Sequence, residues 1–170
     1  MTAGKRKPIT VVQQLAVHTH DRWMCQLCHR PTIFPLALKL LAERTLDVVP
    51  KVTLAYWNPQ WRRDLAPLLD ELAACVDHRT ALSNGGAHEP ANFQTLCARC
   101  NQRKSSKDGD AFLADLKPWR VNGKYGDPKH WDGLSSAYVA FARQPGRTLT
   151  STERAWLTAL EEGIAAQAAR

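Results

Sequence analysis

The chain has 170 residues, with 23 lysines and arginines against 16 aspartates and glutamates, which gives a formal net charge of +7. This length can bury a core of ordinary size, so we expect one domain spanning 1–170, and the positive charge favours a polyanionic partner such as nucleic acid. No apolar run approaches the roughly 20 residues of a membrane-spanning helix, which excludes an integral membrane protein of the helical type.

The N-terminal part predicts a short helix followed by a pair of cysteines. The stretch Thr10–Gln13 has the form of a capping box and predicts a helix that runs to about His18. Trp23 and a first dithiol knuckle, Cys25 and Cys28, come next. One CxxC pair by itself is ambiguous, because such pairs occur in zinc sites and in redox proteins.

Residues 29–72 form a long insertion that is mostly helical in pattern. Pro35 to Glu43 is rich in leucine and predicts a helix, whereas Val48 to Ala55 predicts an extended segment. Asn58-Pro59 places an N-cap residue before proline, which predicts a helix that ends at about Leu72. Packing over the cysteines is the role that we favour for this insertion, with the lining of a nucleic-acid groove as the alternative.

The segment 73–107 carries the second knuckle and the central motif. Ala73 to His78 predicts a strand, Phe93 to Leu96 its antiparallel partner, and Asn101 to Lys107 the start of a helix. Gly85-Gly86 lies between the strands and predicts a tight turn that admits positive φ.

Residues 110–170 predict a helical extension. The expected helices are Asp110 to Leu116, Gly133 to Ala142 and Ser151 to Ala169. Thr150 to Glu153 forms a capping box in front of the last of them. The loop before the second helix carries Trp119, Tyr125 and Trp131. Aromatic residues in a basic loop can stack on bases, but covering a core is our expectation for the two tryptophans.

The two dithiol knuckles together predict a structural zinc site. The second knuckle is Cys97 and Cys100, and four soft thiolates match the tetrahedral preference of zinc. Disulfides are the alternative, but no signal peptide opens the chain and a reducing cytosol keeps thiols free, so we expect a cytoplasmic protein. A thioredoxin-like site is disfavoured, because neither pair lies in a βαβ pattern. A zinc nucleobase deaminase would need H-x-E and P-C-x-x-C elements, which the chain lacks. Cys75 is interpreted as a small buried strand residue rather than a ligand.

Around the second knuckle the sequence reads Asp77-His78, Gly85-Gly86, Asn92 and then Cys97-Ala98-Arg99-Cys100-Asn101-Gln102-Arg103-Lys104. This order and spacing resemble the HNH endonuclease family, whose ββα-metal motif carries a DH pair, a Gly-rich loop, an Asn and a CNxxK or CHxxK turn. The resemblance spans 76–104, with Trp23 to Cys28 as the outlying knuckle. It implies an α+β fold in which a ββα-metal motif is stapled by a four-cysteine zinc site and surrounded by helices. Asn101 gives a His-Asn-Asn variant, and such variants include active members.

By this resemblance, Asp77 and Asn101 bind a catalytic Mg²⁺ or Mn²⁺, His78 activates the attacking water, and Asn92 holds the loop so that His78 points correctly. Adjacent strand residues point to opposite faces, a difficulty that the family resolves by placing the DH pair where the strand gives way to the loop. The chemistry agrees, since phosphodiester hydrolysis needs a base and a cation, and carboxylate and amide oxygens suit Mg²⁺. The expected activity is that of a DNA endonuclease or nickase. A non-catalytic zinc module that binds nucleic acid is the alternative, and RNA stays open as a substrate.

Basic residues near the motif are expected to contact phosphates. These are Arg79, Arg99, Arg103, Lys104 and Lys107. The run Lys5-Arg6-Lys7 is interpreted as a solvated tail. Among the histidines outside the motif, His29 and His88 are candidates for neighbours of the site.

Overall fold

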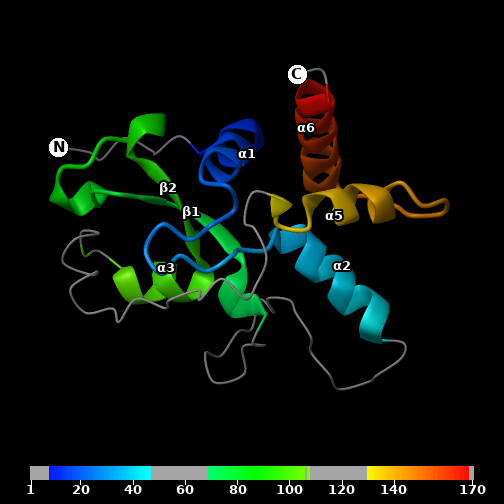
Figure 1. Cartoon of the computed structure of the whole chain (residues 1–170), viewed down its shortest axis with the longest axis horizontal. Coiled ribbons are helices and arrows are strands. Elements are labelled where there is room, and N and C mark those ends of the chain that lie inside the picture. Colours follow the sequence, from blue (N-terminus) through cyan, green and yellow to red (C-terminus); the bar gives the residue numbers. More distant parts are fainter. Residues whose placement is uncertain (1–7, 47–68, 106, 108–129, 169–170) are drawn as a thin grey trace.

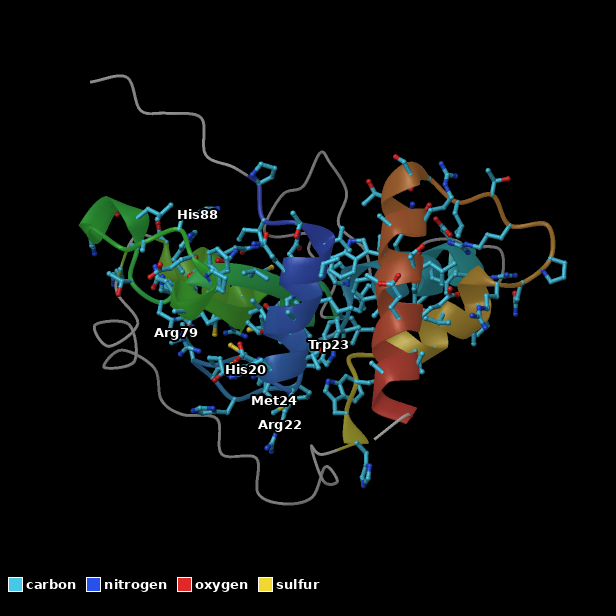
Figure 2. The ribbon with its side chains drawn as sticks, turned by 90° about the horizontal axis from the view of Figure 1, so that it is seen from above. His20, Arg22, Trp23, Met24, Arg79 and His88 are labelled. Carbon is cyan, nitrogen blue, oxygen red and sulfur yellow. The ribbon has the colours of Figure 1, made fainter. Side chains whose placement is uncertain are left out.

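A computed structural model of the chain describes residues 8–46, 69–105, 107 and 130–168. A small antiparallel sheet with one helix lies on one side, a group of helices lies on the other, and helix α1 lies between them (Figure 1, Figure 2). The helices are α1 (Val11–His20), α2 (Pro35–Leu46), α3 (Ala98–Lys104), α5 (Ser135–Ala142) and α6 (Ser151–Ala168). The strands are β1 (Ala74–His78) and β2 (Phe93–Cys97), and short 3₁₀ turns are η2 (Asp70–Leu72), η3 (Leu82–Asn84) and η4 (Pro90–Asn92). This arrangement confirms the predicted α+β class. None of the described helices is both long and apolar enough to cross a membrane.

The sheet and α3 form a ββα unit. Strand β1 pairs with β2 in antiparallel register, with Asp77 opposite Gln94 and His78 opposite Phe93. Every residue of β2 is buried, whereas β1 is mostly half-buried. Helix α3 follows β2 without a linker and packs back against both strands. The last residues of β1 therefore lie between the β1–β2 loop and α3.

Helix α3 begins earlier than the sequence predicts. It starts at Ala98 rather than Asn101, because Cys97 acts as the N-cap and its Sγ accepts the Cys100 N–H at 3.4 Å. It ends at Lys104, since Ser105 adopts a left-handed φ of 50°. The predicted helical segment Asn101 to Lys107 is therefore wrong at both ends, and Asn101 lies in the middle of a short helix.

Helix α5 starts at Ser135 rather than Gly133. Gly133 and Leu134 have φ values of 68° and 64°, which are incompatible with a right-handed helix. The Asp132 carboxylate accepts the N–H groups of Leu134 and Ser136, both at 2.9 Å, and so satisfies donors at the helix start. A capping aspartate followed by two residues of positive φ therefore sets this boundary.

Both predicted capping boxes are confirmed. At α1, the Gln13 N–H donates to Thr10 Oγ1 at 3.2 Å and the Thr10 N–H donates to Gln13 Oε1 at 2.9 Å. This helix continues to His20, beyond the predicted end at His18. At α6, the Glu153 N–H donates to Thr150 Oγ1 at 3.2 Å, and the Glu153 carboxylate accepts the Thr150 N–H at 2.8 Å.

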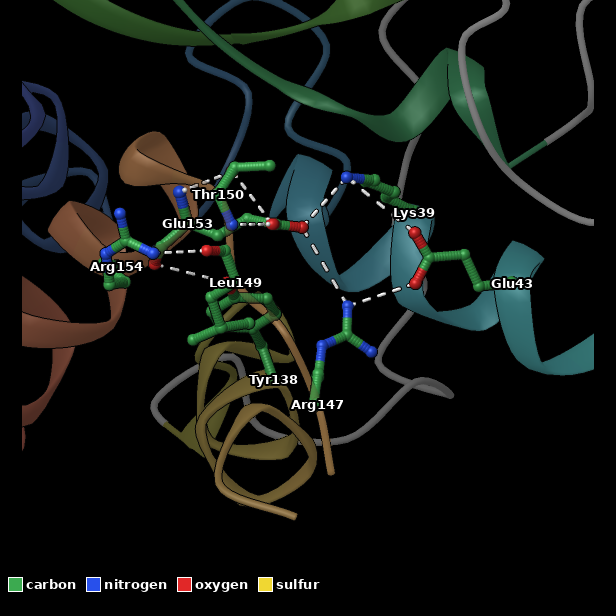
Figure 3. Close-up of polar contacts among 8 residues, drawn as sticks. All are labelled: Lys39, Glu43, Tyr138, Arg147, Leu149, Thr150, Glu153 and Arg154. Carbon is green, nitrogen blue, oxygen red and sulfur yellow. Dashed lines mark hydrogen bonds and ion pairs between the residues drawn. The ribbon is translucent and has the colours of Figure 1, made fainter. Parts of the chain in front are cut away.

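The capping residue Glu153 also joins α6 to α2 (Figure 3). Its carboxylate is buried and accepts a hydrogen bond from Lys39 Nζ at 2.9 Å, with Arg147 at 3.9 Å. Burial raises the pKa of Glu153, but the hydrogen bonds from Lys39 and Thr150 outweigh it and lower the pKa to about 2. One ionised side chain thus caps a helix and fixes its neighbour.

The helices enclose an apolar core. Its large members include Trp23, Phe34, Leu38, Tyr138, Trp156 and Leu160. Trp131 packs against this core and donates its indole N–H to the Thr32 carbonyl at 2.8 Å, which confirms its predicted covering role. Trp119 and Tyr125 lie outside the described residues.

Helix α2 confirms the first helix of the predicted insertion. It packs against α5, and Ala37, Leu38 and Leu40 belong to the helical core rather than to the cysteine cluster. The favoured role of packing over the cysteines is therefore wrong for α2, which packs into the helical core instead. The predicted extended segment Val48 to Ala55 and helix Asp110 to Leu116 lie outside the described residues. So does most of the helix predicted to end at Leu72, whose described end is the 3₁₀ turn η2.

Candidate functional site

The knuckle cysteines form a buried cluster. Cys25 and Cys28 lie on the loop after α1, Cys97 ends β2 and Cys100 lies in the first turn of α3. Their Sγ atoms all lie within 4.8 Å of one another, and those of Cys28 and Cys97 are 3.8 Å apart. Tetrahedral zinc with Zn–S bonds of about 2.3 Å holds its sulfurs about 3.8 Å apart, whereas a disulfide requires about 2.05 Å. The cluster therefore fits one structural zinc ion.

The thiols of this cluster influence one another strongly. Hydrogen bonding to Cys100 lowers the pKa of the Cys25 thiol, and the same partner raises the pKa of Cys97. Burial raises both pKa values, because it disfavours the thiolate. Four buried thiolates repel one another unless a cation compensates their charge, and zinc supplies that charge. Cys75 stays outside the cluster, half-buried on β1, with its Sγ 3.7 Å from the Ala73 carbonyl.

The DH pair occupies the last two positions of β1, and the two side chains contact different elements. The Asp77 carboxylate lies 2.8 Å from Lys104 Nζ of α3. The His78 ring packs edge-on against Phe93 at 5.2 Å, and its Nε2 lies 3.1 Å from His88 Nδ1. This divergence follows from the alternation of side chains along a strand. His88, a candidate neighbour from the sequence, therefore contacts the proposed base directly.

Lys104 is not on the nucleic-acid face that the sequence predicts for it. Its side chain is 1% exposed, and its ammonium donates to the His78 carbonyl at 2.9 Å as well as pairing with Asp77. A buried ammonium needs such partners, because desolvation of an unpaired charge is costly. Lys104 thus connects α3 to both members of the DH pair.

Asn101 lies one turn before Lys104 on α3 and is half-buried. Residues three apart share a helix face, so Asn101 lies on the side of α3 that faces the end of β1. Asp77 carries a carboxylate and Asn101 an amide, on two elements that pack against each other. Both are hard oxygen donors of the kind that Mg²⁺ and Mn²⁺ prefer.

Asn92 holds the two ends of the loop after β1. Its Oδ1 accepts the Thr80 N–H at 2.9 Å, while its Nδ2 donates to the carbonyls of Thr80 at 3.0 Å and Ala87 at 2.8 Å. Gly86 packs beneath this side chain so closely that a Cβ would lie 2.0 Å from the Thr80 oxygen. Gly85 has the positive φ that the sequence predicts, at 84°. The loop that carries His88 is therefore fixed to the end of β1.

The remaining predicted phosphate contacts are exposed, as such contacts require. Arg103 and Lys107 are exposed at and beyond the end of α3, and Arg99 forms an ion pair with Glu71 at 3.0 Å. Arg79 directly follows the DH pair, and its side chain is 46% exposed. His29, the other candidate neighbour, is exposed on the first knuckle.

Asp21, at the end of α1, lies close to the predicted phosphate contact Arg79, which sequence reasoning did not anticipate. Its side chain is 3% exposed and lies 3.1 Å from His20 Nδ1 and 3.9 Å from the Arg79 guanidinium. Its other oxygen accepts the Thr95 N–H of β2 at 2.6 Å. An aspartate after a helix carries no local signal for such partners, since they come from distant parts of the chain.

Comparison with known protein families identifies the ββα unit. Residues 67–107 match the family model described as HNH endonuclease, and the match covers β1, β2, α3 and the loop between the strands. No curated protein and no solved structure matches the chain. This segment is therefore similar to the HNH endonuclease family, which points to a nuclease or nucleic-acid-binding function.

Proposed function

We propose that the protein is a metal-dependent DNA endonuclease or nickase, with His78 as the general base and a divalent cation held by Asp77 and Asn101. The observation that carries this proposal is the end of β1, where the DH pair of an HNH-matching segment is joined to α3 through Lys104. A module that only binds nucleic acid has no need for a base beside two hard oxygen ligands.

The residues present fit a hard divalent cation. The Asp77 side chain is 20% exposed, and Asn101 is a half-buried residue of α3 that carries an amide oxygen. When bound, such a cation stabilises charge on the phosphate and on the leaving oxygen. Zinc has a separate place at the thiol cluster, since soft ligands select it there.

Three contacts prepare His78 to accept a proton from water. The edge contact with Phe93 and the hydrogen bond to His88 orient the imidazole, and Lys104 fixes the backbone carbonyl of the same residue. Asn92 supports this arrangement indirectly, because it holds the loop that presents His88. By resemblance to the family, the products carry 5′-phosphate and 3′-hydroxyl ends.

The exposed cations around this site supply phosphate contacts. Arg79 lies beside His78 in the chain, and Arg103 and Lys107 lie at the end of α3. Such contacts place the nucleic acid on the protein without reading its sequence. Lys104 is excluded from this set by its burial.

The test is cleavage of supercoiled plasmid in Mg²⁺ or Mn²⁺, with chelator as the blank. Loss of a general base typically costs 10²–10⁴-fold in rate, so His78→Ala should lose most cleavage while it retains zinc and DNA binding. Asp77→Ala should regain part of its cleavage at higher metal concentration, because the substitution weakens binding of the cation and leaves the base in place. His130→Ala, a histidine outside the HNH segment, serves as the control.

Two results would contradict the proposal. Wild-type cleavage by the His78→Ala protein would remove the base from the mechanism. A wild-type protein that binds DNA but does not cut it, whichever divalent metal is added, would identify a binding module instead.

A further inference from the structure

A groove of about 410 Å³ lies between α1 and the start of β2. One wall is a stripe of α1 that includes Ala16, Val17 and His20, and the opposite wall includes Arg79, Ala91 and Phe93. We call this cavity the α1 groove. Its volume lies in the range of about 300–1,000 Å³ that is typical of ligand pockets. The groove is therefore large enough for one unit of a polymeric substrate.

The walls of the α1 groove are mostly apolar, and two nitrogen-bearing side chains lie at one end. His20 at the end of α1 and Arg79 after β1 are both labelled in Figure 2, and they lie 3.1 and 3.9 Å from the buried carboxylate of Asp21. Because Asp21 is 3% exposed and also accepts the Thr95 N–H, its negative charge faces the interior of the protein. The Arg79 contact, at 3.9 Å, is longer than a hydrogen bond, so the guanidinium keeps donors for an anion.

The α1 groove adjoins the proposed active site through two of its lining residues, Arg79 and Phe93. The Phe93 ring that forms part of its wall is the ring against which His78 packs, at 5.2 Å. Arg79 is the residue after His78, so the cationic end of the groove adjoins the DH pair. A strand whose phosphate lies at His78 therefore passes the mouth of this groove.

We propose that the α1 groove binds one nucleotide of the substrate strand, next to the phosphodiester that is cut. The Arg79 guanidinium holds a phosphate of that nucleotide, for which a planar fork of donors is suited. The sugar of that nucleotide lies against the apolar side chains of Ala16 and Val17, a contact that carries no sequence information. This inference rests on the proposed function, since it assigns a subsite to the same substrate.

Charge favours a nucleotide over a peptide as the occupant. The exposed end of the groove presents a guanidinium and an imidazole, and the Asp21 carboxylate that both of them contact is buried. The whole chain carries a net charge of +7, which attracts the same polyanion. Because Arg79 lines the groove and directly follows His78, a polyanion bound at the DH pair lies beside the groove.

The test fills the α1 groove with a bulky side chain and measures DNA binding in chelator, where no cleavage occurs. Ala16→Trp obstructs the groove, and Val12→Trp adds the same side chain to an exposed position of the same helix that does not line it. Loss of the contacts to one nucleotide should weaken binding of a short fluorescein-labelled duplex by about tenfold in Ala16→Trp. Val12→Trp should bind as the wild type does, and the zinc content of both variants checks the fold.

A second variant separates the two parts of the subsite. Arg79→Gln should make the dependence of log affinity on log salt shallower by about one unit, whereas Ala16→Trp should weaken binding without changing that slope. Wild-type affinity in Ala16→Trp, or equal weakening in both tryptophan variants, would overturn the groove assignment while plasmid cleavage still stood. A wild-type protein that fails to bind the duplex and fails to cut plasmid would instead overturn the proposed function.

Discussion

Among single residues, Lys104 has the most demanding position in the site. Its ammonium is almost completely buried and reaches the Asp77 carboxylate and the His78 carbonyl, 2.8 and 2.9 Å away. The pairing offsets the desolvation of the lysine, and the same contact restricts the orientation of Asp77. The ammonium contacts one of the two carboxylate oxygens of Asp77. Lys104 therefore acts as a positioning residue for Asp77, the proposed cation ligand.

We expect Lys104→Met to lower the free energy of unfolding of the zinc-loaded protein by about 2 kcal/mol. The substitution removes the hydrogen bond to the His78 carbonyl and the ion-pair partner of Asp77. Urea unfolding measures this change. Arg103→Met alters the exposed neighbour on α3 and should change stability little. In a double-mutant cycle, Lys104→Met should destabilise the Asp77→Asn protein much less than it destabilises the wild type, since the two groups interact directly. Additive effects would show that the ion pair contributes nothing measurable.

The elements are joined by a few polar contacts between α1 and β2. His18 is 2% exposed, its Nδ1 lies 3.0 Å from Thr95 Oγ1, and its ring stacks on Trp23 at 4.8 Å. Asp21 adds the bond from the Thr95 N–H. Burial lowers the pKa of His18 to about 4, against a smaller raising effect of Asp21. The attachment of α1, and with it the α1 groove, therefore depends on a neutral histidine.

This contact makes stability depend on pH in a defined window. The unfolded chain binds a proton on His18 below about pH 6.5, whereas the folded chain takes it up only near pH 4. Stability should thus fall as the pH falls from 6.5 towards 4, by about 2 kcal/mol at pH 5 from this group. Urea unfolding at pH 7.5 and at pH 5 measures this loss of stability. The loss should be smaller in His18→Gln than in the wild type, because glutamine takes up no proton. An equal loss in the two proteins would show that His18 does not titrate in this way.

For the molecule as a whole, the thiol cluster joins segments that are far apart in the sequence. The first knuckle follows α1, and the second lies at the junction of β2 and α3. The cluster has its own buried group, which adds Leu27 and Leu96 to the cysteines and is separate from the helical core. Without a metal, that group is small and holds thiols that cannot all ionise, so metal binding is coupled to folding of the ββα unit.

Removal of zinc should unfold the ββα unit and abolish DNA cleavage. Cys25→Ser should lower the zinc content and the thermal midpoint, because a hydroxyl is a poor ligand for zinc. Cys75→Ser, a cysteine outside the cluster, is the matched control and should keep both. Elemental analysis and thermal denaturation measure the two effects. Absence of zinc from the purified wild-type protein, with unchanged stability of Cys25→Ser, would count against a structural metal.

The sequence by itself determined the features that depend on neighbouring residues. The capping boxes at Thr10 and Thr150 and the two strands are local patterns, and the structure contains each of them. The spacing of the knuckles predicted the cysteine cluster, because four thiols in two CxxC pairs have few other uses in one domain. The HNH segment was identifiable for the same reason, since its motif residues lie within a short stretch. Their catalytic roles remain a prediction.

Only the tertiary structure decided which partners the polar side chains have. Lys104 is bonded to a residue 26 positions away and Asp21 to one 74 positions away, and neither has a local signal for that contact. The pattern placed Lys104 on the nucleic-acid surface, because a lysine at the end of a basic helix is usually exposed. Its burial follows from the packing of α3 against β1, which leaves the ammonium nearest to a carboxylate rather than to water. The α1 groove arises in the same way, from surfaces of α1 and β2 that meet only when the chain is folded.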